Sequence, residues 1–171
     1  MRWQSVLRFI ALVVVWIFTS GADSCSATTK ADPTFVADLV LKNAAGVPRQ
    51  EFAPGDPITM ELTVRNRSNT EAILQFTTNQ QFDFVVVDGG TSRTRWLWSF
   101  GKAFLQGTTE LEFAPNQTRT FVVTWDQLDN ARLPVSVGNY EARGVLLFAE
   151  FAFNPLAQSQ LGSPVRAFTI R

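Results

Sequence analysis

The side chains of this sequence that could do chemistry are mainly carboxylates, and two of them lie close together on one predicted strand. Glu110 and Glu112 alternate with Leu111 and Phe113. A pair of carboxyl groups across a sugar bond is the arrangement that glycoside hydrolases use. Strict alternation is also what a half-buried strand shows on its solvent face. We therefore interpret both glutamates as solvated surface residues and predict no hydrolytic site here.

Three aspartates, Asp83, Asp88 and Asp126, offer oxygen atoms of the kind that bind calcium. Their spacing matches no calcium-binding loop, so we predict that they belong to turns and strand ends. Asp88 precedes two glycines, which predicts a hairpin turn. A phosphate-binding loop would also need a lysine and a following helix.

The 171 residues include no histidine and a single cysteine, Cys25. Ser-His-Asp and Cys-His catalytic sets and the usual zinc sites are therefore excluded. We predict a protein that is not an enzyme and that uses no metal or other cofactor. The 15 basic and 15 acidic residues cancel, so nothing indicates a nucleic-acid partner.

Residues 1–24 have the pattern of a secretory signal. Arg2 and Arg8 precede the apolar run 9–18, and small and polar residues follow it, which is the order expected for export. The run is shorter than the roughly 20 residues of a membrane-spanning helix. We expect an exported protein of the cell envelope or periplasm, with an uncleaved N-terminal anchor as the alternative.

Cys25 directly follows this segment and leaves two outcomes open. Its position resembles that of the acceptor cysteine of bacterial lipoproteins, which predicts lipidation and membrane anchoring through Cys25. Ala22 and Ser24 also fit ordinary cleavage after Ser24, which predicts soluble export. A single cysteine cannot form an internal disulfide, so the core alone must hold the mature domain.

The rest of the chain predicts one domain of strands. Residues 25–34 are small and polar and predict a flexible tether, and residues 35–171 predict the folded domain. Its runs of β-branched and aromatic residues are 35–42, 58–66, 71–77, 82–88, 93–100, 108–114, 118–126, 139–150 and 164–171. Because residues 58, 60, 62 and 64 are apolar and their neighbours are polar, one face of that run is buried. We predict an all-β fold, an immunoglobulin-like antiparallel β-sandwich of about eight or nine strands.

The most aromatic run predicts a hairpin with the run before it. A period of two places Trp96, Trp98 and Phe100 on one face, opposite the phenylalanines of 82–88. Either these rings form the core, or one or both tryptophans lie at the rim beside Arg95 and Lys102 and contact a partner.

Ordered motifs between about Phe52 and Phe148 resemble the BsuPI family, named after a Bacillus intracellular proteinase inhibitor. They are Phe76, Phe82-Asp83-Phe84, Trp96-Leu97-Trp98-Ser99, Gly101-Lys102 with Phe104, Pro115, Trp125-Asp126, and Gly138 with Tyr140. The resemblance implies an immunoglobulin-like β-sandwich that inhibits a proteinase, so that its partner is a protein.

Inhibition needs an exposed loop, and two segments are candidates. We predict partner contacts at Trp98, Lys102 and Phe104 in the segment 98–106, and at Arg132 and Leu133 in the loop 131–137. An arginine or a leucine is a side chain that a protease pocket could accept. The alternative function is a structural or protein-interaction module of the cell envelope without inhibitory activity.

Overall fold

The computed structural model describes residues 34–149 and 158–171, and every regular element in these residues is a β-strand. The strands are β1 (Phe35–Lys42), β2 (Glu51–Phe52), β3 (Ile58–Asn66), β4 (Ala72–Thr78), β5 (Phe82–Asp88), β6 (Thr94–Leu97), β7 (Gln106–Phe113), β8 (Thr118–Trp125), β9 (Gly138–Ala149), β10 (Gln158–Gly162) and β11 (Arg166–Ile170). None of the described residues forms a helix long and apolar enough to cross a membrane. Cys25, the predicted signal and the predicted tether up to residue 33 lie outside the described residues.

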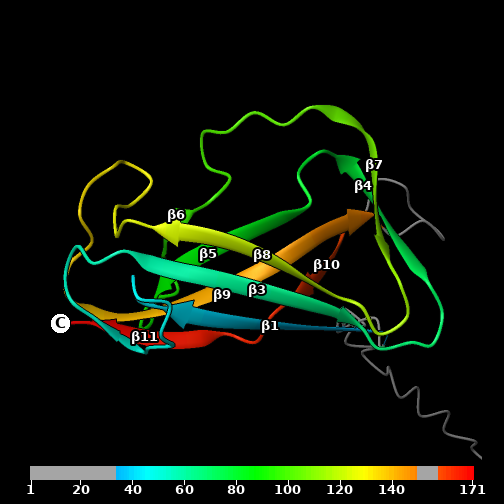
Figure 1. Ribbon diagram of the computed structural model, residues 1–171. Coiled ribbons are helices and arrows are strands. Elements are labelled where there is room, and N and C mark those ends of the chain that lie inside the picture. The colour runs from blue at the N-terminus through cyan, green and yellow to red at the C-terminus, as the bar shows by residue number, and fades with distance from the viewer. Residues whose placement is uncertain (1–33, 150–157) are drawn as a thin grey trace, which may run out of the picture.

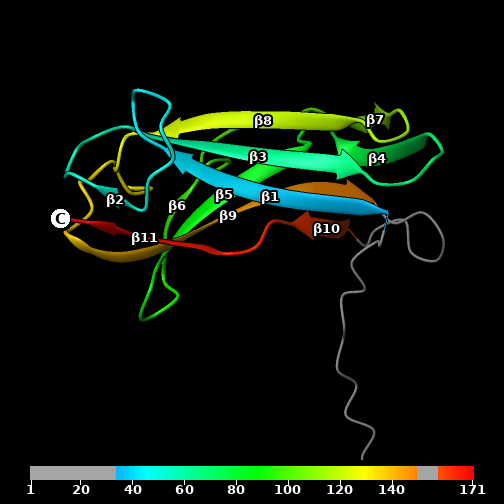
Figure 2. The same cartoon turned by 60° about the horizontal axis from the view of Figure 1, so that its bottom comes forward.

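Two sheets pack face to face in the molecule. One has the strand order β1-β3-β8, and the other has the order β2-β11-β9-β5-β6, with β10 also pairing with β9. Figure 2 shows the first layer above the second, and β4 pairs with β7 at one end of the sandwich (Figure 1). All pairs are antiparallel except the short parallel pair β11–β2. The prediction of an all-β, immunoglobulin-like antiparallel sandwich is confirmed.

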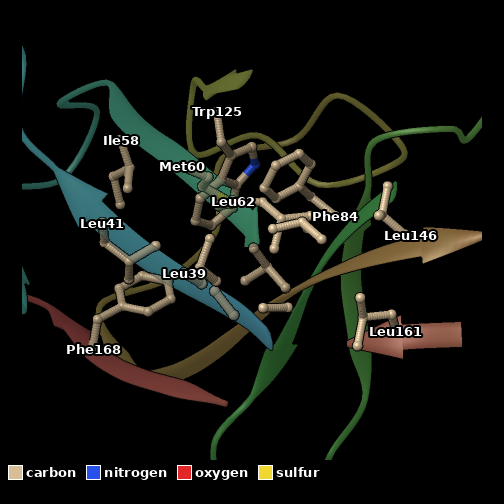
Figure 3. Close-up of a cluster of buried hydrophobic side chains, with 14 of the residues drawn as sticks. Leu39, Leu41, Ile58, Met60, Leu62, Phe84, Trp125, Leu146, Leu161 and Phe168 are labelled. Carbon is tan, nitrogen blue, oxygen red and sulfur yellow. The ribbon is translucent and has the colours of Figure 1, made fainter. Parts of the chain in front are cut away.

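The alternating apolar residues form the core between the layers. In β3 the alternate residues from Ile58 to Val64 are fully buried. Figure 3 shows Ile58, Met60 and Leu62 clustered with Phe84 of β5 and Phe168 of β11. Trp125, at the end of β8, is also fully buried. Each such side chain stabilises the fold by about 1.5–3 kcal/mol relative to an exposed position.

The two layers approach closely at Gly144 of β9. A Cβ atom at this position would lie 3.2 Å from three atoms of the Leu62 side chain in β3. Because protein interiors are close-packed, a side chain here would push the layers apart. Glycine therefore sets the distance between β9 and β3 at this point.

The predicted bounds hold for β1, β3 and β5 but not for the aromatic run. There the strand ends at Leu97, where the backbone N of Phe100 donates to the carbonyl oxygen of Leu97 at 3.0 Å. Phe100 is therefore not on the tryptophan face as predicted, and its side chain is 59% exposed. The short β2 and β10 were not predicted, and they bring the strands of the described residues to eleven.

Candidate functional site

Two exposed segments adjoin the edge strand β6. The 98–106 segment leaves β6 and leads to β7, and the 126–137 loop connects β8 to β9 (Figure 1). The structure brings the predicted residues Trp98, Lys102 and Phe104 together in the first segment. Arg132 and Leu133 lie in the second.

A buried carboxylate fixes the start of the 98–106 segment. Asp83 of β5 is 7% exposed, and its Oδ1 accepts hydrogen bonds from the backbone N of Phe84 at 2.8 Å and of Ser99 at 3.1 Å. Its Oδ2 accepts from the Ser99 hydroxyl and from the side-chain amide of Gln80. Asp83 lies near a strand end, the start of β5, as predicted, and the structure shows in addition that it is a buried anchor. These hydrogen bonds hold the chain where it turns away from β6.

Trp98 is half-buried in a cluster of rings that joins this segment to the core. Its ring centroid lies 4.6 Å from that of Phe82 and 6.0 Å from that of Phe104. Phe82 in turn lies 5.0 Å from Phe121 of the other layer. From the sequence, Trp98 could lie either in the core or at the rim of the sandwich. In the structure the half-buried ring packs on Phe82 of β5 and also contacts Phe104 of the exposed segment.

Lys102 covers the other side of the Trp98 ring. Its Nζ lies 3.4 Å from the ring centroid, a cation–π contact worth about 0.5–2 kcal/mol. Loss of hydration lowers the pKa of Lys102, and the negative charge of Asp83 acts in the opposite direction. The ammonium group thus lies on the Trp98 ring, while Lys102 as a whole is an exposed residue.

Asn79 fixes the far end of the segment. The backbone N of Leu105 donates to Oδ1 of Asn79 at 2.9 Å, and the Leu105 carbonyl oxygen accepts from the Asn79 backbone N at 3.1 Å. Gly101, with φ of +73°, makes the turn between the ends, which glycine does without strain. The fixed segment exposes two large apolar side chains, Phe100 at 59% and Leu105 at 77%.

Reasoning from the sequence missed these two residues as contact candidates. The sequence contains one signal for each of these two exposed residues. Gly101 marks a turn at Phe100, and the consecutive apolar residues 103–105 break the period of two that a half-buried strand requires.

The tip of the 126–137 loop is a closed turn around Asp129. Its Oδ1 accepts from the backbone N of Ala131 at 2.8 Å and of Leu133 at 2.9 Å, and its backbone N donates to the Leu133 carbonyl oxygen at 2.8 Å. Arg132 has φ of +64° and pairs with Asp126 at 3.0 Å, both side chains being exposed. Leu133 is 61% exposed. This tip presents both predicted residues, but not on an extended chain.

Backbone and side-chain hydrogen bonds of Asn130 and Gln127 attach this loop to the sandwich. The backbone N of Asn130 donates to the Arg95 carbonyl oxygen, and its Oδ1 accepts from the Leu97 backbone N, both at 3.0 Å. Gln127, 2% exposed, accepts from the Gly55 backbone N and donates to the carbonyl oxygens of Ala53 and Asp56. The loop is therefore fixed, and it covers the outer edge of β6.

The β5–β6 hairpin closes at the predicted glycine turn. Arg95 Nε lies 2.7 Å from Asp88 Oδ1 across it. This hydrogen bond is the main cause that lowers the pKa of Asp88, and it also raises the pKa of Arg95. Arg95 is thus engaged with the hairpin turn, while Trp96 packs on the buried Trp125 ring at 5.9 Å.

The described carboxylates form no cluster that could hold a metal ion. Glu110 and Glu112 are exposed on β7, as predicted, and Oε1 of Glu110 accepts from the Gln75 amide at 2.9 Å. Within residues 34–149 and 158–171, no three side chains of His, Cys, Asp or Glu lie close enough together to hold a metal ion. The two segments can act through shape, apolar contact and charge.

The chain is similar to one known protein family. A family model described as BsuPI, intracellular proteinase inhibitor, matches residues 37–151 and so includes both segments. A search of curated proteins found no significant match.

Similar solved structures include three proteins of low sequence identity. The sporulation control protein Spo0M from Bacillus subtilis has a TM-score of 0.46 and 11% identity over 82% of this chain and 50% of its own. The CARDB domain of a Pyrococcus furiosus protein, in complex with di-metal ions, has a TM-score of 0.41 and 10% identity over 80% and 87%. A β-glucosidase from Erythrobacter marinus has a TM-score of 0.43 and 13% identity over 80% of this chain and 15% of its own.

Proposed function

This chain belongs to the BsuPI family of intracellular proteinase inhibitors, and we propose that it is a non-enzymatic domain that binds a protease through the 98–106 segment. One observation carries the choice of segment. Asp83 and Asn79 fix its two ends, and between them Phe100 and Leu105 expose large apolar side chains to solvent.

A fixed segment suits inhibition because little conformational freedom is lost on binding. Ordering a mobile loop weakens association, whereas a loop already held in its bound shape avoids that cost. Protease–inhibitor complexes bury about 1,600 Å² in total and move the interface backbone little. Trp98 and Phe104 would support such a loop from below, and Phe100 and Leu105 would enter the partner.

The 126–137 loop is proposed as a lateral contact in the same complex. A peptide that binds by strand addition lies extended along its partner, whereas the chain around Arg132 forms a closed turn. Arg132 and Leu133 would therefore contact the rim of the protease rather than fill its central pocket.

We further propose that the protein is exported to the cell envelope or periplasm. The support is the signal pattern of residues 1–24 and the position of Cys25. Metabolic labelling with a clickable fatty acid separates lipidation of Cys25 from soluble export, with Cys25→Ser as the control. An intact Met1 terminus recovered from the cytoplasm would contradict both forms.

The proposed inhibition is tested by titrating a panel of serine, cysteine and metalloproteases with the purified protein, processed as its producing cell leaves it. We expect stoichiometric, competitive inhibition of at least one protease. Leu105→Ser should weaken it at least tenfold, a change of about 1.4 kcal/mol, with unchanged thermal stability because the side chain is exposed. Arg132→Ala should weaken it less.

Val165→Ser is the matched control, because Val165 is 53% exposed and lies outside both segments. It should inhibit like the unmodified protein. A folded protein that slows no protease of the panel at micromolar concentration would overturn inhibition and favour a module of the cell envelope that only binds or supports other proteins.

A further inference from the structure

Among the described strands, β8 pairs only with β3, so one of its edges is open. The backbone groups of alternate residues point to opposite edges of a strand. Because the Gln117 carbonyl oxygen accepts from Asn66 on the β3 side, the odd-numbered residues of β8 face β3. The N–H and C=O groups of Thr118, Thr120, Val122 and Thr124 therefore point outward, and none of the hydrogen bonds described outside the ladder uses them.

The outer edges of β6 and β1 are capped in part. Asn130 covers the edge of β6 by bonding to the backbone of Arg95 and Leu97. On β1, the guanidinium of Arg166 donates to the Leu39 carbonyl oxygen at 2.7 Å, and the backbone N of Arg49 donates to Leu41 at 2.9 Å. Against these capped edges, the open edge of β8 is a distinct feature of the fold (Figure 2).

The β8 edge also lacks the usual protection against pairing. Natural edge strands carry lysine, proline or a bulge, and β8 has none of these. Its outward residues are three threonines and one valine, all exposed and uncharged. The one charged residue of the strand, Arg119, donates to the Glu112 carbonyl oxygen at 2.9 Å and lies over the Phe113 ring. Its charge is thus engaged with β7.

We propose that β8 pairs antiparallel with β8 of a second copy of this chain, an association that goes beyond protease binding and does not depend on it. A twofold axis at Phe121 would place Thr118 opposite Thr124 and Thr120 opposite Val122. β-branched residues pair favourably across strands, and no like charges meet. The formal net charge of zero adds no repulsion between copies.

The result is an isologous dimer in which two three-stranded sheets join into one continuous sheet. This choice of partner rests on self-complementarity, because an uncharged, β-branched edge fits a copy of itself. A charged peptide would find no opposite charge among the outward residues.

The test is the mass of the full processed protein in sedimentation equilibrium over a range of concentrations. We expect a reversible dimer. Val122→Lys places two lysines close to the axis and should raise the dissociation constant at least tenfold. Val165→Lys, at an equally exposed valine outside β8, is the control and should leave the dimer intact. A monomer at every concentration, or a dimer indifferent to Val122→Lys, overturns the proposal.

Amide hydrogen exchange tests the same edge without a substitution, and it decides the matter if Val122→Lys does not fold. The outward amides of Thr120, Val122 and Thr124 should exchange fast in dilute solution and slowly at high concentration. Slow exchange of these amides in a dilute monomer would show that another part of the chain occupies the edge, and would overturn the dimer.

Discussion

Trp125 and Trp98 stand at similar places in the chain, one as the last residue of β8 and the other directly after β6. Trp125 is fully buried, contacts Tyr140 and Phe168, and donates its indole N–H to the Leu128 carbonyl oxygen at 2.8 Å. Trp98 is half-buried and has Lys102 on its ring.

The difference shows how one residue type has two roles in the same sandwich. The packed rings of Trp125, Tyr140 and Phe168 close the core, and the indole hydrogen bond to Leu128 fixes the start of the 126–137 loop. At Trp98 the ring is a platform, with core residues on one side and an exposed segment on the other. A burial argument from sequence alone cannot separate these roles, because both residues alternate with apolar neighbours.

Replacing Trp125 by alanine tests its place in the core most directly. We expect it to lower the free energy of unfolding by about 3–5 kcal/mol, because a fully buried ring is lost and a cavity remains. Urea unfolding measures this loss, and Trp125→Phe, which removes the indole hydrogen bond and only part of the buried ring, should cost about 1–3 kcal/mol. A loss below about 1 kcal/mol for Trp125→Ala would show that the ring is not a core residue.

Trp98→Ala should have a smaller effect on stability and a larger one on binding. We expect a loss of about 1–3 kcal/mol in the free energy of unfolding, because the half-buried site can relax around the deletion. Protease inhibition should weaken in the same variant because Phe104 and Lys102 lose their platform. Trp98→Phe keeps a ring and serves as the control. Equal losses of stability for Trp98→Ala and Trp125→Ala would remove the distinction between the two sites.

The smallest expected effect concerns Asp88 and Arg95, at the hairpin that leads to the Trp98 cluster. The pKa of Asp88 is lowered in the folded protein, chiefly by its hydrogen bond to Arg95. The pair therefore stabilises the fold fully above the ordinary aspartate pKa of about 3.9. It loses that contribution as the pH falls below this value through the lowered pKa.

Asp88→Asn should accordingly flatten the acid limb of the pH–stability profile while changing stability little at neutral pH, since partly exposed pairs contribute little. The profile is measured by urea unfolding at several pH values between neutrality and strong acid. An acid limb as steep as that of the unmodified protein would show that Asp88 does not contribute to it.

The fold was largely predictable because most of its strands are determined by patterns within short stretches of sequence. In β1 and β3 the period of two in burial spans the whole strand, and burial of one face is enough to define it. β2 could not be found this way, because two residues show no period and the strand exists through pairing with β11.

The candidate site was less predictable because tertiary hydrogen bonds shape it. The period of two continued through Phe100, but the bonds from Ser99 to the buried Asp83 end that pattern in the structure. Likewise, the backbone of Leu105 is held by a hydrogen bond to Asn79, which is distant in sequence, and this leaves the Leu105 side chain exposed. The aromatic motif identified the right segment, whereas the exposed residues within it depended on contacts that no local pattern shows.

Lys102, which lies on the Trp98 ring, is a site at which the 98–106 segment can be labelled chemically. A lowered pKa leaves more of the Lys102 amine uncharged in mildly alkaline solution, and the uncharged amine is the form that attacks acylating reagents. Lys42, the other lysine of the described residues, is held by Glu61 at 2.6 Å. A brief reaction with a small activated ester should therefore modify Lys102 ahead of Lys42. It would place a fluorophore beside Phe104, where the arrival of a partner can be observed directly.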